Sequence, residues 1–304
     1  MNDSSDLTVF TITSEGYIPG VVGLVESLRD HGFMGPICIG AMDAASEALD
    51  GPGISTTRID DDEAFSSNLK PQLLLSQDCE KFLFLDADIV VTHDRFVERV
   101  VEWAEEAPVF AVEGLVAPTD YRRHVWERLA GDQKRRNRLV YYNAGMFAGV
   151  MQRERSLLER WKRLNETVLD PADRHFDNES FRLPDQDTLN AILQERSHHE
   201  IISVQPPDWR SEAIPHSPFL HVGGFTGGTA FRHCTTSEKP WYLDEIPSRP
   251  PNPYERVWVE HVTGDSTSIS HEVSLPVGIR RWLNESLDGR LAVKLKQLRG
   301  RFFS

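Results

Sequence analysis

The chain has 304 residues, enough for one large α/β domain or two smaller ones, and its 39% apolar and 26% charged residues are ordinary for a globular protein. The net charge of −14 argues against a general nucleic-acid binder, which needs a basic face, although local cations or a metal still suit a nucleotide diphosphate. No apolar run approaches the ~20 residues that span a bilayer, the N-terminus MNDSSDLTVF does not resemble a secretory signal, and the three cysteines lack metal-ligand spacing. We therefore expect a cytoplasmic protein.

Strand and helix patterns alternate over about the first 115 residues, which favours a parallel, doubly wound sheet. Ligands of such sheets bind beyond the carboxyl ends of the strands. The predicted strands are 7–13, 35–43, 82–85 and 108–114, and the predicted helices are 16–32, ending at Gly32, the segment after Pro71, and 94–106.

Elements of both kinds continue after a charged segment at 119–138, which we expect to be a helical excursion. The stretch from Pro240 to Pro253 is rich in proline and is typical of a linker. The pattern predicts a strand with small residues at 141–151, an amphipathic helix at 153–169, a helix at 183–196 and a short strand at 217–224.

The run FLFLDADIVV, residues 82–91, delivers Asp86 and Asp88 at the end of a predicted buried strand. Charged side chains are rarely buried unless they are paired or bind a cation. In one interpretation the strand stops at Asp86 and both carboxylates are solvated. In the other, alternate residues of an extended segment point the same way, so both carboxylates converge on one metal ion. The pair alone does not decide between them.

Four further motifs follow this DxD pair in order: NAGMFAG, DQDTLNAIL, LHVGG and KPW. The series, over roughly residues 7 to 241, resembles glycosyltransferase family 8, the group of glycogenin and the lipopolysaccharide galactosyltransferases. The resemblance implies an α/β chain with a GT-A-type doubly wound mixed sheet. It also implies a catalytic domain over 1–245, followed over 246–304 by a Pro-rich linker and a helical C-terminal extension.

The resemblance also assigns roles to residues of this chain. Asp86 and Asp88 would bind Mn²⁺ (or Mg²⁺) and the donor, and two carboxylates with a diphosphate suit a hard cation. Asp185 and Gln186 would lie beside the reacting carbon of the sugar, although Asp185 after Leu-Pro is also an ordinary helix N-cap. The donor-binding residues implied by the family are Lys70, Asp86, Ala87, Asp88, Asn143, Ala144, Gly145 and Lys239.

The third metal ligand departs from the family pattern, in which a histidine precedes the lysine of KPW by six residues and a glycine follows that histidine by three. His233 has the spacing to Lys239, but Thr236 replaces the glycine. His221 ends a better strand and has Gly224 in place, but it lies farther from Lys239. We favour His221, which requires an inserted loop.

By this resemblance the expected activity is a metal-dependent, retaining transfer of a hexose from a nucleotide-diphosphate sugar, with UDP-glucose or UDP-galactose as the precedent, to an unidentified acceptor. A haloacid-dehalogenase-type phosphohydrolase also starts with an apolar strand and D-x-D, but its later acidic pair is missing after the motif. A non-catalytic protein that binds sugar nucleotides is the other alternative.

The C-terminal residues 280–304 are basic, with seven Lys or Arg against Glu285 and Asp288. A basic amphipathic helix is typical of a membrane-surface segment or a partner-binding helix. Packing on the acidic catalytic domain is the alternative, and the sequence leaves both open, as it does homo-oligomerisation. The apolar face of this helix would be formed by Leu283, Leu287, Leu291, Leu295, Leu298 and Phe302.

Overall fold

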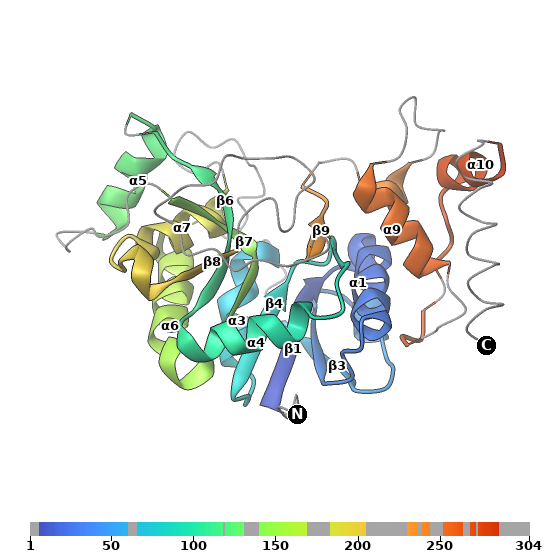
Figure 1. Ribbon diagram of the computed structural model, residues 1–304, viewed down its shortest axis with the longest axis horizontal. Coiled ribbons are helices and arrows are strands. Elements are labelled where there is room, and N and C mark those ends of the chain that lie inside the picture. The colour runs from blue at the N-terminus through green and yellow to red at the C-terminus, as the bar shows by residue number, and fades with distance from the viewer. Residues whose placement is uncertain are drawn as a thin grey trace.

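A seven-stranded sheet with strand order β3-β2-β1-β4-β7-β6-β8 forms the central layer of the protein (Figure 1). The computed structural model describes residues 6–59, 66–117, 119–130, 140–168, 183–204, 230–235, 239–243, 252–263, 268–271 and 273–285.

The first half of the sheet is parallel. Strands β1, β2 and β4 are short, mostly apolar and mostly buried, as expected of strands that helices cover on both faces, whereas the edge strand β3 is polar and partly exposed. The β1 strand pairs in parallel with β2 on one side and with β4 on the other, while β3 extends the sheet beyond β2. The bounds are β1 (Leu7–Thr13), β2 (Ile37–Ala41), β3 (Ile54–Arg58) and β4 (Lys81–Leu85).

The long strand β7 (Val140–Val150) makes the sheet mixed. It runs antiparallel to β4 on one side and to β6 (Val109–Leu115) on the other, and β8 (Ile202–Val204) then pairs in parallel with β6. All of its residues except Val150 are buried, which agrees with its apolar and small side chains. This arrangement confirms the expected α/β mixed sheet.

Helices cover both faces of the sheet. One hydrophobic cluster packs α1 and α4 against it, and a second packs α3, α6 and α7 against the other face. Residues 121–130 of the predicted excursion form α5, which packs on α7. The bounds are α1 (Ile18–Asp30), α2 (Ala44–Glu47), α3 (Lys70–Leu75), α4 (Phe96–Glu106), α5 (Tyr121–Ala130), α6 (Met151–Val168) and α7 (Pro184–Leu193), with short 3₁₀ turns η2 (Glu15–Tyr17), η3 (Ser66–Leu69) and η4 (His198–Glu200).

A second sheet of two strands lies next to the end of β4. Its strands, β5 (Ile89–Val91) and β9 (Phe231–His233), pair antiparallel, so Ile89 lies opposite His233. The 3₁₀ turn η5 (Pro240–Tyr242) follows β9 in the chain, and α9 (Pro253–Val262) packs against α1 on the right of Figure 1.

Residues 240–243 correct one expectation, because they are folded and not a linker. Trp241 and Leu243 are buried in a cluster with Tyr254 and Trp258 of α9. Local proline content predicted a linker, but burial of these large side chains against α9 is what orders the segment. The domain division at 245/246 stays a prediction.

The last described helix is α10 (Val277–Glu285). The tail from Leu287 to Phe302 and the strand predicted at 217–224 lie outside the described residues, so the expected basic helix and its membrane contact stay predictions. Within the described ranges, every helix is too short or too polar to cross a membrane.

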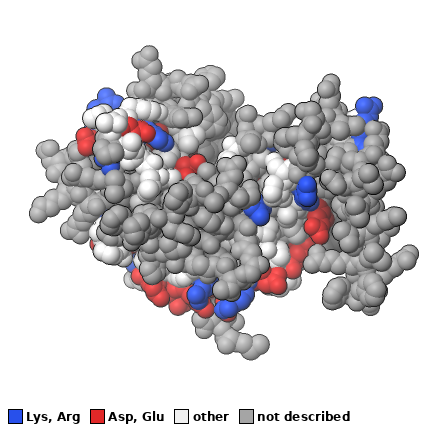
Figure 2. Space-filling model, turned by 45° about the horizontal axis from the view of Figure 1, so that its top comes forward, with Lys and Arg blue, Asp and Glu red and all other residues white. Residues whose placement is uncertain are grey.

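Charged side chains are unevenly spread over the face drawn in Figure 2. The Asp and Glu side chains of the described residues gather along the lower edge of this view, where a few Lys and Arg lie among them. Exposed acidic residues therefore contribute to the negative charge of the sequence.

Candidate metal and donor site

The turn after β4 presents two carboxylates at one point. The backbone N–H of Asp86 donates to the carbonyl of Gly145 on β7, and the N–H of Ile89 donates back to the carbonyl of Asp86, which closes a tight turn. The N–H of Cys234 donates to the carbonyl of Asp88 at 2.9 Å, so β9 is anchored to the same turn.

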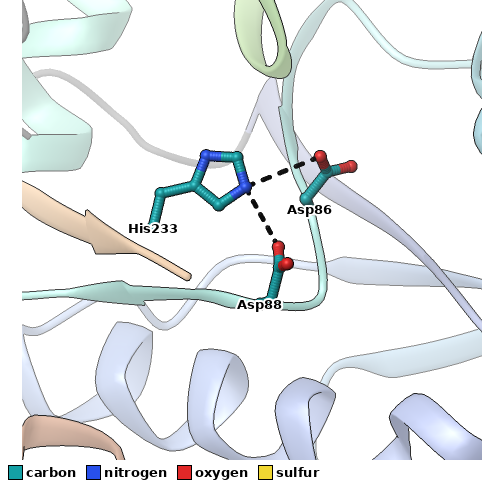
Figure 3. A group of neighbouring side chains, drawn as sticks. All are labelled: Asp86, Asp88 and His233. Atoms are coloured by element: carbon teal, nitrogen blue, oxygen red, sulfur yellow. Dashed lines mark ion pairs between the residues drawn. The ribbon is translucent and has the colours of Figure 1, made fainter. Parts of the chain in front are cut away.

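The β5–β9 pairing brings His233 to both carboxylates (Figure 3). Its Nε2 lies 3.1 Å from Asp88 Oδ1 and 3.9 Å from Asp86 Oδ2. One ligand atom from each of the three residues lies within 4.8 Å of the others. Among the described residues this is the one such group of three that could share a metal ion.

The residues present fit a divalent cation. Carboxylate oxygens with one imidazole nitrogen suit Mg²⁺ or Mn²⁺ better than a soft metal. Space at this point depends on Gly145, because a Cβ there would lie 2.5 Å from Asp86 Oδ2 and 2.6 Å from His233 Cε1. The first glycine of the NAGMFAG motif therefore keeps the centre of the cluster open.

Two buried lysines neutralise the carboxylates. Lys239 Nζ lies 2.6 Å from Asp88 Oδ2 and also donates to the carbonyl of Cys234. Lys70 Nζ lies 2.9 Å from Asp86 Oδ1 and 3.0 Å from Asp185 Oδ2. Lys70 therefore links the metal-binding candidate Asp86 to the catalytic candidate Asp185.

These contacts make the two aspartates electrostatically different. Burial by itself would raise the pKa of Asp88, but the neighbouring His233 and Lys239 outweigh it, and the pKa lies well below its usual range. For Asp86, burial and the negative charge of Asp88 outweigh the attraction of Lys70, so its pKa is raised. Burial would lower the pKa of Lys70, but Asp185 and Asp86 raise it, which keeps the ammonium group charged.

The residues Asn143, Ala144 and Gly145 lie at an irregularity in the β6–β7 pairing, where the register shifts between Phe110 and Ala111. Such bulges re-aim side chains next to functional sites. The Asn143 amide donates to Glu113 Oε2 at 2.8 Å, and its oxygen accepts from the N–H of Gly145. Lys70 donates to the carbonyl of Ala144, so the segment is tied to the charged cluster.

Asp185 and Gln186 lie in the first turn of α7. Asp187 accepts the N–H of Leu183, the N-cap residue, whereas Asp185 makes no capping bond and points its carboxylate to Lys70. The capping interpretation of Asp185 is therefore wrong, because the N-cap position of α7 is occupied by Leu183 and Asp185 lies inside the first turn. Gln186 Oε1 accepts the N–H of Ala144, which fixes the start of α7 against β7.

No protein-family model matches the chain, and neither does any curated protein sequence. Similar folds occur in solved structures. The galactosyltransferase LgtC in complex with donor and acceptor sugar analogues aligns over 78% of this chain and 90% of its own, with 15% identity and a TM-score of 0.52. An active-site mutant of LgtC aligns over 90% of this chain and 99% of its own, with 13% identity and a TM-score of 0.56.

The glycosyltransferase GlyE of Streptococcus pneumoniae aligns over 86% of this chain but only 61% of its own, with 16% identity and a TM-score of 0.53. The chain has the fold of these glycosyltransferases. The expected GT-A-type fold is thereby confirmed, and at this level of identity the likeness concerns the fold alone.

Within this GT-A-type fold, the structure brings the predicted site residues close together, except His221, which lies outside the described residues. Contacts join Lys70, Asp86, Asp88, Asn143, Ala144, Gly145, Asp185, Gln186 and Lys239, and Ala87 lies in the turn between the two aspartates.

Two residues of the site were not favoured from the sequence. For His233, the spacing to Lys239 was the available signal. For Tyr17, whose ring centroid lies 6.0 Å from Lys239 Nζ, the sequence gives no signal, because the contact depends on η5.

Proposed function

We propose that this protein is a metal-dependent, retaining glycosyltransferase that moves a hexose from a nucleotide-diphosphate sugar to an acceptor. The observation that carries the proposal is the cluster of Asp86, Asp88 and His233, which lies in a glycosyltransferase fold and next to Lys70 and Lys239. UDP-glucose or UDP-galactose is the proposed donor, by the family resemblance of the motifs.

Asp86, Asp88 and His233 would hold Mn²⁺ or Mg²⁺. When bound, the metal would neutralise the charge that develops on the departing diphosphate. Lys239 is a second cation at the same place, because its Nζ already lies against Asp88 in a buried environment where an ammonium group interacts strongly with an anion. The chain thus supplies three candidate ligands for a metal ion and, in Lys239, a positive charge of its own.

The bond that breaks joins the anomeric carbon to a phosphate oxygen, and positive charge develops on the sugar. Asp185 is 7% exposed, and Lys70 holds its carboxylate in one orientation. In the proposed donor complex, the carboxylate of Asp185 would stabilise the positive charge on the sugar or attack the anomeric carbon as a nucleophile. Gln186 is the next residue in α7. Lys70 also contacts Asp86. It would therefore align both Asp185 at the anomeric carbon and Asp86 at the leaving phosphate.

The test measures the release of nucleoside diphosphate from a panel of sugar nucleotides in the presence of Mn²⁺. We expect release with at least one donor, and loss of release in excess chelator and in Asp88→Asn. Full activity in chelator would contradict the metal dependence. Donor binding without any release would identify a non-catalytic binding protein.

The third ligand is tested by titrating Mn²⁺ against activity in His233→Ala and His221→Ala. We expect His233→Ala to need much more metal. His31→Ala is a matched control, because His31 also pairs with an aspartate, Asp94, but at the far end of α1. If only His221→Ala needs more metal, His221 is the ligand and His233 is a neighbour.

A further inference from the structure

One face of α1 carries two glycines, Gly20 and Gly23, that lie about one turn apart. A Cβ at Gly20 would lie 2.5 Å from the carbonyl oxygen of Ala87 and 2.7 Å from Cη2 of Trp241. A Cβ at Gly23 would lie 2.5 Å from Cδ1 of Trp258. This face of α1 is therefore in direct contact with the turn between Asp86 and Asp88 and with two indole rings.

Trp258 joins α9 to this face. It is fully buried, and its Nε1–H donates to the carbonyl of Pro19 at 2.9 Å. Its ring centroid lies 5.6 Å from that of Trp241, with the planes at 50°. Trp258 therefore contacts α1 and Trp241 at the same time.

Trp241 depends on these ring contacts for its position. Its Nε1 is buried and finds no hydrogen-bond partner in the described part of the chain. Its ring packs against Trp258 and against Tyr17 and Tyr242, whose centroids lie 5.8 Å and 6.1 Å away. Since a buried indole normally gains a hydrogen bond as well as apolar contacts, packing alone fixes this side chain.

Lys239 lies two residues before Trp241 in the same short turn. Its carbonyl accepts the N–H of Tyr242, which closes η5, and its Nζ reaches Asp88 Oδ2 at 2.6 Å. A 3₁₀ turn of three residues has little freedom between its ends, so a displacement of the Trp241 ring moves the backbone that carries Lys239.

We propose that Trp258 is a positioning residue for Lys239, and that α9 thereby contributes to donor binding. This inference rests on the proposed function, in which Lys239 contacts the diphosphate. Trp258 acts through the ring of Trp241, and the two glycines of α1 provide the space that both rings need. The C-terminal part of the chain then determines how well the site binds a nucleoside diphosphate.

The experiment uses the full chain and four variants: Trp258→Leu, Lys239→Met, the double variant, and Trp103→Leu as a control. Trp103 is also a buried tryptophan, but it lies on α4 and packs in the cluster that joins α1 and α4 to the sheet, apart from the cluster of Trp241 and Trp258. Binding of UDP with Mn²⁺ is measured by calorimetry. We expect Trp258→Leu and Lys239→Met each to weaken binding about tenfold or more, since hydrogen bonds to charged groups contribute strongly.

The double variant should bind no more weakly than Lys239→Met alone, because both changes remove one interaction. Trp103→Leu should lose stability but bind UDP as the wild type does. Additive losses, or equal binding by Trp258→Leu and Trp103→Leu, would overturn the proposal. Trp258→Phe, which keeps an aromatic ring, should recover part of the affinity.

A second measurement does not depend on the donor. The rate at which an amine-reactive reagent labels Lys239 is followed by peptide mass spectrometry. We expect slow labelling in the wild type and in Trp103→Leu, and faster labelling in Trp258→Leu. If the wild type does not bind UDP, the proposed function fails, and labelling still decides whether Trp258 holds Lys239. Unchanged labelling in Trp258→Leu would overturn the positioning role.

Discussion

Replacing Gly145 by alanine would place a methyl group at the centre of the candidate metal site. Gly145 lies in β7 and does not have a positive φ, so alanine fits the backbone, and the effect is steric. The new Cβ would lie 2.5 Å from Asp86 Oδ2, 2.6 Å from His233 Cε1 and 2.8 Å from Asn143 Oδ1. To restore an ordinary contact of about 3.4 Å, the Asp86 oxygen must move by about 0.9 Å and the His233 carbon by about 0.8 Å.

Such displacements separate two metal ligands that now face each other. Disturbing the groups that orient metal ligands typically weakens affinity by about 10- to 100-fold, and we expect a loss in that range for Mn²⁺. Overpacking should also lower the free energy of unfolding by about 1–3 kcal/mol. Titration of Mn²⁺ measures the first effect, and urea denaturation without metal measures the second.

Gly149→Ala is the matched control on the same strand. Its Cβ would lie 2.7 Å from Glu154 Cγ and 3.2 Å from Phe82 Cζ, so its packing strain is similar. We expect a comparable loss of stability with unchanged affinity for Mn²⁺. If Gly145→Ala binds Mn²⁺ as tightly as Gly149→Ala does, the cluster of Asp86, Asp88 and His233 is not the metal site.

Three other predictions concern the buried charges. Asp185→Asn should lower turnover far more than donor affinity, because its charge acts where positive charge develops in the transition state; equal losses in kinetics and in binding would indicate a positioning role. Lys70→Met should lower the free energy of unfolding by about 3 kcal/mol in urea, since it leaves the buried carboxylate of Asp185 and the partly exposed carboxylate of Asp86 without their cation; a negligible loss would contradict the ion pairs with Asp86 and Asp185. Burial raises the pKa of Asp187, so the folded state holds its proton more tightly than the unfolded state does. The stability of the wild type relative to Asp187→Asn should therefore fall as the pH rises above about 4, and denaturation at several pH values that gave the opposite trend would refute this.

Local physical rules were sufficient for the first half of the fold. The run LTVFTIT is β1, and α1 ends at Asp30, two residues before Gly32, whose φ of +84° favours glycine. Asp86 and Asp88 follow β4, because an apolar run of this length forms one buried strand and the charges lie just beyond it. Each of these features depends on residues that are close together in the sequence.

The parts that sequence reasoning did not favour depend on distant contacts. His233 reaches the aspartates because the three-residue strand β9 pairs with β5, and a strand that short carries no pattern of its own. Trp241 lies in a proline-rich stretch, and burial against Trp258 orders it. The roles of Asp185 and Asp187 could not be separated by position, since both lie in the first turn of α7.

The packing of α9 on α1 has a consequence for biosynthesis. Trp258 contacts Pro19 across 239 positions of sequence, and Lys239 contacts Asp88 across 151. A ribosome that adds about 5–20 residues per second makes Lys239 some 8–30 s after Asp88. During that interval the nascent chain carries its acidic pair without the lysine that balances Asp88. The candidate site is therefore complete only after Lys239 and Trp258 have been made, and a chain released before that point is left with an incomplete fold that proteases readily attack.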